Sequence, residues 1–272
     1  RGKGMWGYLR NLPLLRKKIR EFKPQLIHAH SGMSALLSVL QRMVPVFVTF
    51  HGTDINNERL RRYSRLAMML SKKQVVVSGH MAKLLGHPQM EVLPCGVDTR
   101  VFKPVSRQEA AAKLGLNPEE IHILFSSSFE NPVKNYPLAR QAIQLCPDLP
   151  LHLHPLSGLS RQETALMMNA CHVCLLSSHS EGSPQFIKEA MACGTAIVST
   201  HVGDVYSQLH SLDGCFVCNP VPEEMANAIR LAVSFSKHQG KTQGLQRIVE
   251  NGLEASRIAK RLHNIYREIA LP

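Results

Sequence analysis

The sequence lacks several features that would assign a chain to a structural class at first sight. Its 272 residues contain no run approaching eighteen uninterrupted apolar residues, so hydropathy predicts no transmembrane helix. There is no low-complexity tract and no internal repeat of solenoid length, which argues against a repeat protein. An Asp-x-Asp pair, which would suit a divalent cation, is also missing. What remains is an ordinary globular composition with 44% hydrophobic residues.

The chain also lacks an even cysteine count. Its seven cysteines include two pairs with C-x-x-C spacing, Cys171/Cys174 and Cys215/Cys218, the spacing of a four-thiolate zinc site. Both pairs lie in short apolar segments typical of strands, where positions i and i+3 point to opposite faces. We therefore expect buried structural thiols rather than a metal site, with zinc as the open alternative. The odd count, with no secretion signal in view, predicts a reducing, cytoplasmic location.

The charge of the chain is strongly positive and unevenly distributed. The net charge of +12 favours anionic partners. Residues 1–24 hold eight Lys and Arg against one acid, and apolar residues recur there at helical spacing. The pattern predicts a basic amphipathic helix, which is either a solvated face packed on a domain or a peripheral contact with an anionic membrane at its inner face. Nucleic acid is not an expected partner, because no aromatic–basic interleaving or known motif accompanies the charge.

Helical and strand patterns alternate along the first part of the chain. Runs rich in Val, Ile and Leu that alternate with helices predict parallel strands covered on both faces. The expected helices are 12–22, 33–43, 57–71 and 80–85, and the expected strands are 25–29, 46–50, 74–78 and 90–93. The segment 94–104 breaks this rhythm with Gly96 and two prolines, and we interpret it as an interdomain hinge.

The alternation then resumes and predicts a second domain of the same class. The expected helices are 106–114, 135–145, 160–170, 184–193 and 222–235, the expected strands are 121–125, 149–154, 173–176, 196–199 and 215–218, and an amphipathic segment covers 245–270. The predicted fold is α/β, with two doubly wound Rossmann-like domains facing across a cleft. We place the first domain at 1–103, the second at 104–255, and a helix that crosses back to the first domain at 256–272.

Residues 177–194 form the most informative segment. They follow the apolar strand 173–176 and open a helix. Gly182 permits a tight turn, Ser183 can cap the helix, and Pro184 suits its first position. Ligands of open parallel sheets bind at the carboxyl ends of the strands. The backbone N–H groups of this helix start therefore predict an anion site for a diphosphate.

Two glutamates frame this helix start. Glu181 precedes the turn, and Glu189 lies more than one turn into the helix among apolar residues. An acid close to a buried face needs a partner, and sugar hydroxyls would supply one because a carboxylate can accept two hydrogen bonds at once. On composition alone, a surface glutamate on an amphipathic helix is an equal alternative.

The spacing of these glutamates resembles the E-x7-E motif of the family-4 retaining glycosyltransferases, which have the GT-B fold. Residues 191–200 and 202–204 resemble that family's continuation, and residues 51–54 and 96–104 resemble its N-domain loop and hinge. The similar segments cover nearly the whole chain and occur in the expected order. A complete N-domain of this fold has more strands than the four expected here, so the resemblance implies that the N-terminal domain is incomplete.

The resemblance implies a role for each matched residue. Glu189 would bind the donor ribose, and Glu181 would lie by the donor hexose at its reacting end. The backbone of Gly182, Ser183 and Pro184 would contact the hexose and the phosphate. Lys134 matches the family lysine that neutralises the diphosphate, and its charge would stabilise the departing nucleoside diphosphate.

The chain departs from the family at one position of the phosphate clamp. Ser128 stands where the family usually has an arginine, so Ser127 and Ser128 would hold phosphate through hydroxyls and backbone amides, with less charge. By resemblance, His30 and His51 would lie near the donor sugar and the acceptor, where either could bind a sugar hydroxyl. We expect a structural role for His28, because it lies inside a strand.

The implied function is transfer of a sugar from a nucleoside-diphosphate sugar to a glycan or lipid-linked acceptor, with retention at the anomeric carbon and without a metal or cofactor. The family suggests a role in cell-surface polysaccharide synthesis. Residues 1–103 would form the acceptor side, and residues 104–255 would bind the donor. Two alternatives stay open: a catalytically impaired module that binds nucleotide sugars, and an epimerase or phosphorylase of the same fold.

Overall fold

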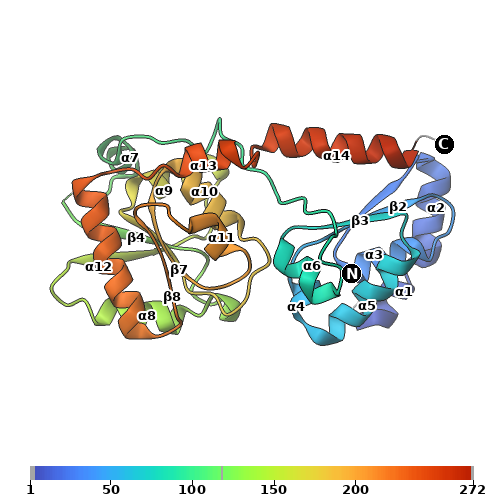
Figure 1. Cartoon of the computed structure of the whole chain (residues 1–272), viewed down its shortest axis with the longest axis horizontal. Coiled ribbons are helices and arrows are strands. Elements are labelled where there is room, and N and C mark those ends of the chain that lie inside the picture. The colour runs from blue at the N-terminus through green and yellow to red at the C-terminus, as the bar shows by residue number, and fades with distance from the viewer. Residues whose placement is uncertain (1–3, 118, 271–272) are drawn as a thin grey trace. The chain divides into compact units, whose positions relative to one another are not determined.

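The computed structural model describes residues 4–117 and 119–270. The chain divides into two compact units: unit 1 comprises residues 1–95 and 258–272, and unit 2 comprises residues 96–257. Each unit has its own sheet, and every strand pairing in both sheets is parallel (Figure 1). The predicted α/β class with two parallel-sheet units is confirmed.

Unit 1 is built on three parallel strands in the order β1-β2-β3. The strands are β1 (Ile27–His30), β2 (Val46–Phe50) and β3 (Lys73–Val76). The helices are α1 (Gly4–Leu9), α2 (Leu12–Phe22), α3 (Gly32–Val39), α4 (Thr53–Asn56), α5 (Glu58–Leu70), α6 (Gly79–Leu85) and, from residue 258 onward, α14 (Ala255–Ala270). All five residues of β2 are buried, because this central strand is covered on both faces.

The prediction of a fourth strand at residues 90–93 is wrong. Within this segment only Val92 forms a bridge, to Val76 at the end of β3. Leu93 donates its N–H to the Val76 carbonyl over 2.8 Å, and Pro94 follows at once. Because proline has no N–H to continue the ladder, the apolar run ends as a single bridge.

The amphipathic C-terminal segment forms two helices, α13 (Gly244–Glu250) and α14. They are separated at Gly252, whose φ of +63° favours glycine. The apolar face of α14 packs on the sheet of unit 1. The buried residues of this cluster are Phe47, Val75, Leu93, Ile258, Ile265 and Ile269. The last helix of the chain thus completes the core of the first unit.

Unit 2 contains a five-stranded sheet in the order β5-β4-β6-β7-β8. The strands are β4 (Ile121–Phe125), β5 (Leu151–Pro155), β6 (Val173–Leu176), β7 (Ala196–Thr200) and β8 (Cys215–Cys218). The helices are α7 (Arg107–Leu114), the 3₁₀ turn η1 (Pro132–Lys134), α8 (Tyr136–Gln144), α9 (Arg161–Ala170), α10 (Gln185–Cys193), α11 (Val205–Leu209), α12 (Pro222–His238) and α13. Helices α9 and α10 cover one face of the sheet, and α8 and α12 cover the other (Figure 1).

The strand order of unit 2 reverses between β4 and β6. From β4 the chain adds β5 on one side and then crosses over to add β6 on the other. Ligands of doubly wound sheets bind at the carboxyl ends of the strands that flank such a switch point. The loops after β4 and β6 are therefore the two places where the topology favours a ligand.

The expectation that C-x-x-C cysteines point to opposite sheet faces is correct for one pair and wrong for the other. Cys215 and Cys218 pack against different apolar clusters on the two faces. Cys171 and Cys174 share one cluster, because Cys171 caps the end of α9 and lies outside the strand. Burial raises the pKa of both of these thiols. Over residues 4–117 and 119–270, no three His, Cys, Asp or Glu side chains are grouped as a metal would need.

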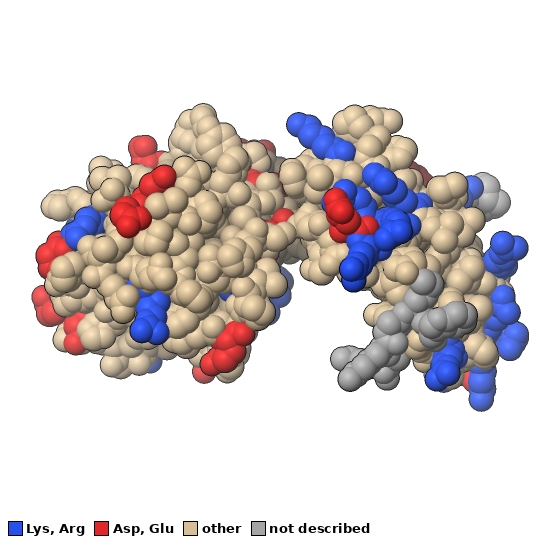
Figure 2. Space-filling model, turned by 90° about the horizontal axis from the view of Figure 1, so that it is seen from below, with Lys and Arg blue, Asp and Glu red and all other residues tan. Residues whose placement is uncertain are grey.

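The net excess of positive charge lies in one unit. Unit 1 holds 19 Lys and Arg against 5 Asp and Glu, whereas unit 2 holds 13 against 15. In Figure 2 the Lys and Arg side chains gather over the part of the surface formed by unit 1. Long-range attraction of an extended anionic surface is therefore stronger at unit 1 than at unit 2.

Helix α2 has the bounds that the sequence predicts, Leu12–Phe22. Ile19 is its buried residue, whereas Leu14 and Phe22 are 55% and 76% exposed. Part of its apolar stripe thus faces solvent next to its basic residues. Among the described helices, none has both the length and the apolarity that crossing a bilayer requires.

Candidate functional site

The two loops at the switch point of unit 2 are joined by hydrogen bonds. Ser177, fully buried after β6, donates its hydroxyl to the carbonyls of Lys134 (2.8 Å) and Asn135 (3.0 Å) in the loop after β4. The His179 N–H donates to the Val133 carbonyl over 2.9 Å. The predicted diphosphate lysine and the predicted glutamate loop are therefore held together by residues that the sequence places more than 40 positions apart.

Lys134 and Glu181 form an ion pair at this junction. Their side-chain N···O distance is 2.6 Å, and the side chains are 18% and 16% exposed. Ser178 donates a hydroxyl hydrogen bond of 2.7 Å to the same Glu181 oxygen. Sequence reasoning assigned the lysine to phosphate and the glutamate to the hexose. In the structure these two charges are each other's partners.

The backbone of the turn at Glu181 and Gly182 packs closely against a glycine in the loop after β7. Gly203 has a φ of +55°, and a Cβ at this position would lie 2.6 Å from the Gly182 carbonyl oxygen and 3.0 Å from that of Glu181. The Thr200 hydroxyl donates to the Ser178 carbonyl over 2.8 Å. The residues after β7 are therefore the platform on which the loop after β6 rests.

The start of α10 differs from the predicted cap. Pro184 is the N-cap with a φ of −65°, the helix begins at Gln185, and no described side chain caps it. The Ser183 hydroxyl instead accepts a hydrogen bond of 3.2 Å from Lys188. The first-turn N–H groups of a helix have no intrahelical partner, so this helix start retains its capacity for an anion.

The ammonium of Lys188 is enclosed beside this loop, although sequence reasoning assigned no role to this residue. Lys188 is fully buried on α10, and its charge favours the ionised form of the neighbouring Asp204. Burial raises the pKa of Asp204, while hydrogen bonds from Ser183 and Gln208 act in the opposite direction. A lysine within the apolar run of α10 was the available signal, because a buried ammonium requires polar partners.

Glu189 lies one helical turn after Gln185 and is half-buried. The Gln185 amide donates to it over 3.4 Å and to the Gly96 carbonyl over 3.0 Å. Burial raises the pKa of Glu189, opposed by that hydrogen bond and by the charges of Arg161 and Lys188. A carboxylate has about four acceptor positions, so one long hydrogen bond leaves capacity for ligand hydroxyls.

Two buried polar atoms near this edge have no hydrogen-bond partner among the described residues. They are the Ser126 hydroxyl, directly after β4, and the side-chain oxygen of Gln185 at the start of α10. An unsatisfied buried polar group costs about 1–3 kcal/mol. Ser127 and Ser128 follow in the same loop and are half-buried, with the Ser127 hydroxyl accepting a hydrogen bond of 3.4 Å from Asn131. A polar ligand would satisfy groups that the protein leaves unpaired.

His30 and His51 lie together in unit 1. His30 ends β1, His51 follows β2, and Nδ1 of His30 lies 2.8 Å from Nε2 of His51. Burial lowers the pKa of His30. Parallel pairing of β1 with β2 brings the two residues to one edge of the sheet. The site residues thus form two groups, the histidines in unit 1 and the remaining residues in unit 2.

Asp54 fixes the backbone around these histidines, a role that the sequence did not indicate. Its buried carboxylate accepts hydrogen bonds from the N–H groups of Gly52 (2.9 Å), Gly32 (3.1 Å) and His51 (3.2 Å). It thereby joins the loops after β1 and β2. An aspartate four residues after a strand was the only local signal, and it does not reveal the contact with Gly32.

His28 has partners on both ring nitrogens. Its Nδ1 lies 2.6 Å from the Tyr266 hydroxyl on α14, and its Nε2 lies 2.8 Å from the Thr49 hydroxyl. Burial, with the charges of His30 and His51, lowers the pKa of His28 to about 4. The neutral ring therefore joins the last helix to the sheet of unit 1.

Two segments of the chain match protein-family models. Residues 2–101 match the family model described as Glycosyltransferase Family 4, and residues 152–234 match the model described as Glycosyl transferases group 1. Both matched segments thus resemble glycosyltransferase domains. Its two α/β units with parallel sheets have the GT-B fold of its structural neighbours.

The curated relatives are also glycosyltransferases. The chain is 25% identical to the putative teichuronic acid biosynthesis glycosyltransferase TuaC of Bacillus subtilis, over 93% of this chain and 72% of that protein. Several D-inositol 3-phosphate glycosyltransferases match at 25–28% identity, and the chain spans 58% of their length or less.

Solved structures resemble the chain over nearly its full length at low sequence identity. Sucrose-phosphate synthase from Thermosynechococcus elongatus has a TM-score of 0.80 at 18% identity, covering 96% of this chain and 78% of that one. HepE from Anabaena, solved in complex with UDP, has a TM-score of 0.78 at 15% identity, covering 98% of this chain and 85% of that one. At such identities the similarity establishes the fold.

Proposed function

We propose that this glycosyltransferase moves a sugar from a nucleoside-diphosphate sugar to a glycan or lipid-linked acceptor, with retention at the anomeric carbon and without a metal. One observation carries the proposal. The switch point of unit 2 places a lysine, a glutamate and an uncapped helix start together, with a second glutamate eight residues beyond the first. That set suits a diphosphate flanked by two groups of hydroxyls.

In this proposal the donor lies along the carboxyl edge of the unit 2 sheet. The diphosphate binds the start of α10 and Lys134, and Glu189 accepts hydrogen bonds from the ribose. The polar groups of Ser126, Ser127 and Ser128 supply further phosphate contacts. Ser128 stands where the family usually has an arginine, so Lys134 carries a larger share of the charge stabilisation.

In this proposal, donor binding changes the partners of the ion pair between Lys134 and Glu181. Phosphate oxygens either displace the Glu181 carboxylate from the Lys134 ammonium or bind the ammonium beside it. Glu181 then accepts hydrogen bonds from hexose hydroxyls. The bond between the anomeric carbon and the diphosphate oxygen breaks, and the acceptor oxygen bonds to that carbon on the same face. The acceptor proton passes to the departing diphosphate. The protein contributes position and charge.

His30 and His51 complete the proposal in unit 1. Burial keeps His30 neutral at physiological pH, and a neutral imidazole can donate through one nitrogen and accept through the other. We assign the pair to sugar hydroxyls of donor or acceptor. The relatives named above act in polysaccharide and inositol glycoside synthesis, which supports an acceptor of this class.

Replacing Glu189 by alanine tests the donor site. Calorimetry of the chain with UDP, ADP and GDP identifies the preferred base, UDP being the ligand of HepE. Glu189→Ala is expected to weaken binding of the preferred nucleotide by about 1–3 kcal/mol, or about 5- to 150-fold in affinity, because the ribose hydroxyls lose a charged acceptor. Glu223→Ala, an exposed glutamate of α12, is the matched control and leaves affinity unchanged. Equal affinity in a folded Glu189→Ala chain removes Glu189 from the site.

A catalytically impaired nucleotide-sugar-binding module is the second candidate, and Ser128 in place of an arginine favours it. Product analysis with the matching nucleotide sugar separates the two functions. Glycosidic product of retained configuration that still forms in EDTA supports the transferase without a metal. Tight donor binding with no product supports the module.

We also propose that unit 1 makes a peripheral contact with anionic membrane through α2. The helix presents Arg16, Lys17, Lys18 and Arg20 beside the exposed Phe22, on the unit that holds the excess positive charge. Each basic residue near an anionic surface contributes roughly 1 kcal/mol. Glu21 neutralises part of this positive charge, because it forms an ion pair of 2.8 Å with Lys18.

Liposome co-sedimentation tests this contact. The chain is expected to bind vesicles rich in phosphatidylserine, to release them as salt rises, and to ignore neutral vesicles. Changing the four basic residues of α2 to Gln should lower binding at least tenfold. A control with four exposed cations of unit 2 changed to Gln (Arg100, Lys103, Lys113 and Arg140) removes equal charge and should bind normally. Equal loss in both variants would contradict a specific role of α2.

A further inference from the structure

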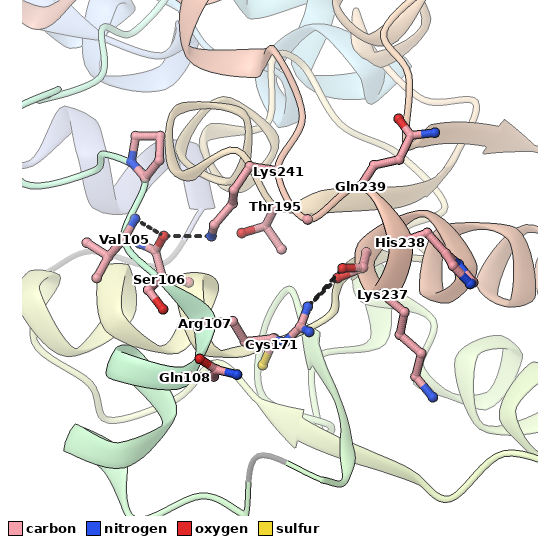
Figure 3. Close-up of a pocket in the computed structure, with 14 residues that line it drawn as sticks. Val105, Ser106, Arg107, Gln108, Cys171, Thr195, Lys237, His238, Gln239 and Lys241 are labelled. Carbon is pink, nitrogen blue, oxygen red and sulfur yellow. Dashed lines mark hydrogen bonds between the residues drawn. The ribbon is translucent and has the colours of Figure 1, made fainter.

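A cavity of about 520 Å³ lies within unit 2, at the edge of the sheet opposite the proposed donor site. Its wall includes Cys171, two residues before β6, and Thr195, directly before β7, so it lies at the amino ends of the strands. The start of α7 and the end of α12 form further parts of the wall (Figure 3). A volume of this size is within the range of about 300–1,000 Å³ typical of small-molecule sites.

The charged residues of this cavity are all basic. Arg107, Lys237 and Lys241 line it together with His238, and no Asp or Glu is among its described lining residues. Unit 2 as a whole contains more acids than bases, 15 against 13. The clustering is therefore a local feature of the cavity and does not follow from the composition of the unit.

The two inner cations have neutral partners. Lys241 donates to the Asn169 side-chain oxygen over 2.8 Å, and Arg107 donates to the carbonyl and hydroxyl of Ser236 over 3.0 Å each (Figure 3). Burial lowers the pKa of Arg107, and it lowers that of Lys241 to about 8. Uncompensated charge at a half-buried position is unfavourable, and a bound anion would relieve it.

The geometry of the cations is set in advance by Asn169, which is 1% exposed. Its oxygen also accepts the Val105 N–H over 2.8 Å, and its amide donates to the carbonyls of Lys103 and Ala165. Every polar atom of the side chain is thus engaged, so the position of Lys241 is fixed by a rigid group. Ser106 also lines the cavity and is the N-cap of α7, and its side chain caps none of the first-turn N–H groups of this helix.

We propose that this cavity binds a small phosphomonoester, such as a sugar phosphate, at a second site of unit 2. Two ordered cations and the helix start suit the three oxygens of a phosphate, and the remaining volume suits a polar body attached to it. The site lies at the opposite strand ends from the donor loops, so it is separate from the proposed transfer chemistry. In this proposal its ligand is neither the donor nor the acceptor.

Calorimetric titration with glucose 6-phosphate tests the site, with glucose as the uncharged control. Binding is expected for the phosphorylated sugar alone. Arg107→Gln and Lys241→Gln should each weaken it at least tenfold, because a charge-assisted hydrogen bond is lost. Lys113→Gln, an exposed cation on the same helix as Arg107, is the matched control and leaves binding unchanged. Lys134→Ala also leaves it unchanged if the ligand avoids the donor loops.

A measurement on the unaltered chain removes any dependence on the folding of these variants. The Lys241 amine is accessible to an amine-acylating reagent through the cavity, and mass spectrometry reports its modification. Glucose 6-phosphate is expected to protect Lys241 and to leave Lys113 reactive. Absence of binding heat and of protection overturns the proposal. Binding that is lost in Lys134→Ala but retained in Arg107→Gln and Lys241→Gln assigns the sugar phosphate to the donor loops, which equally overturns it.

Discussion

Replacing Lys134 by alanine is expected to lower the affinity for a nucleoside diphosphate by about 30- to 150-fold, or about 2–3 kcal/mol. The affinity for the corresponding nucleoside should change by less than about twofold. In the proposed site the lysine ammonium contacts the diphosphate, and nucleosides lack a diphosphate. Calorimetry with both ligands gives the two values. Equal losses for both would show that Lys134 does not contact phosphate.

The ion pair adds a second arm to this test. Glu181 holds the Lys134 ammonium at 2.6 Å, so phosphate must compete with a carboxylate. Glu181→Gln removes the competing charge and should raise the affinity for the diphosphate while lowering turnover, since the hexose loses its acceptor. In the double variant the gain should disappear, because it depends on the lysine. A gain that persists without Lys134 would contradict competition for the ammonium.

Gly203→Ala is expected to destabilise unit 2 by about 3 kcal/mol and to reduce donor affinity at least tenfold. A residue with a Cβ is strained by about 1–2 kcal/mol at a left-handed φ, and overpacking adds a similar amount. The added methyl meets the Gly182 carbonyl oxygen at 2.6 Å, so the turn that supports Glu181 must move. Denaturant unfolding and calorimetry report the two effects.

Gly115→Ala is the matched control for the backbone strain. Gly115 has a φ of +66° and no neighbouring atom within 4 Å of an added Cβ, so it carries the strain without the collision. It should lose about 1–2 kcal/mol of stability and keep full donor affinity. If Gly203→Ala also loses only about 1–2 kcal/mol of stability and keeps full donor affinity, the residues after β7 can move to accommodate the methyl group. The turn at Glu181 and Gly182 would then not depend on Gly203.

The sequence predicts the elements that are buried on both faces with the fewest errors. Strands β2, β4 and β6 have the predicted bounds, because continuous apolar runs between helices have few alternatives. The segment 90–93 is also mostly apolar but fails as a strand, since Pro94 ends its ladder after one bridge. Composition predicts which segments are buried, whereas residues such as proline decide whether a buried segment can pair with a neighbouring strand.

The sequence predicts which residues belong to the candidate site, but it does not predict which of them contact one another. Motif spacing selects Lys134, Glu181 and Glu189, whereas the contact between the first two depends on the strand order of the sheet. The buried Lys188 and the three backbone contacts of Asp54 were missed for the same reason. Local patterns do not encode which distant loop a side chain meets.

The docking of α14 on unit 1 has a consequence for the order of events during synthesis. Phe47 and Val75 emerge from the ribosome long before Ile258, Ile265 and Ile269, which cover them. Unit 2 is continuous in sequence and can therefore fold while unit 1 still exposes one apolar face of its sheet. The nascent chain thus carries an uncovered hydrophobic surface from the synthesis of β3 until α14 emerges, and chaperones can bind this surface during that interval.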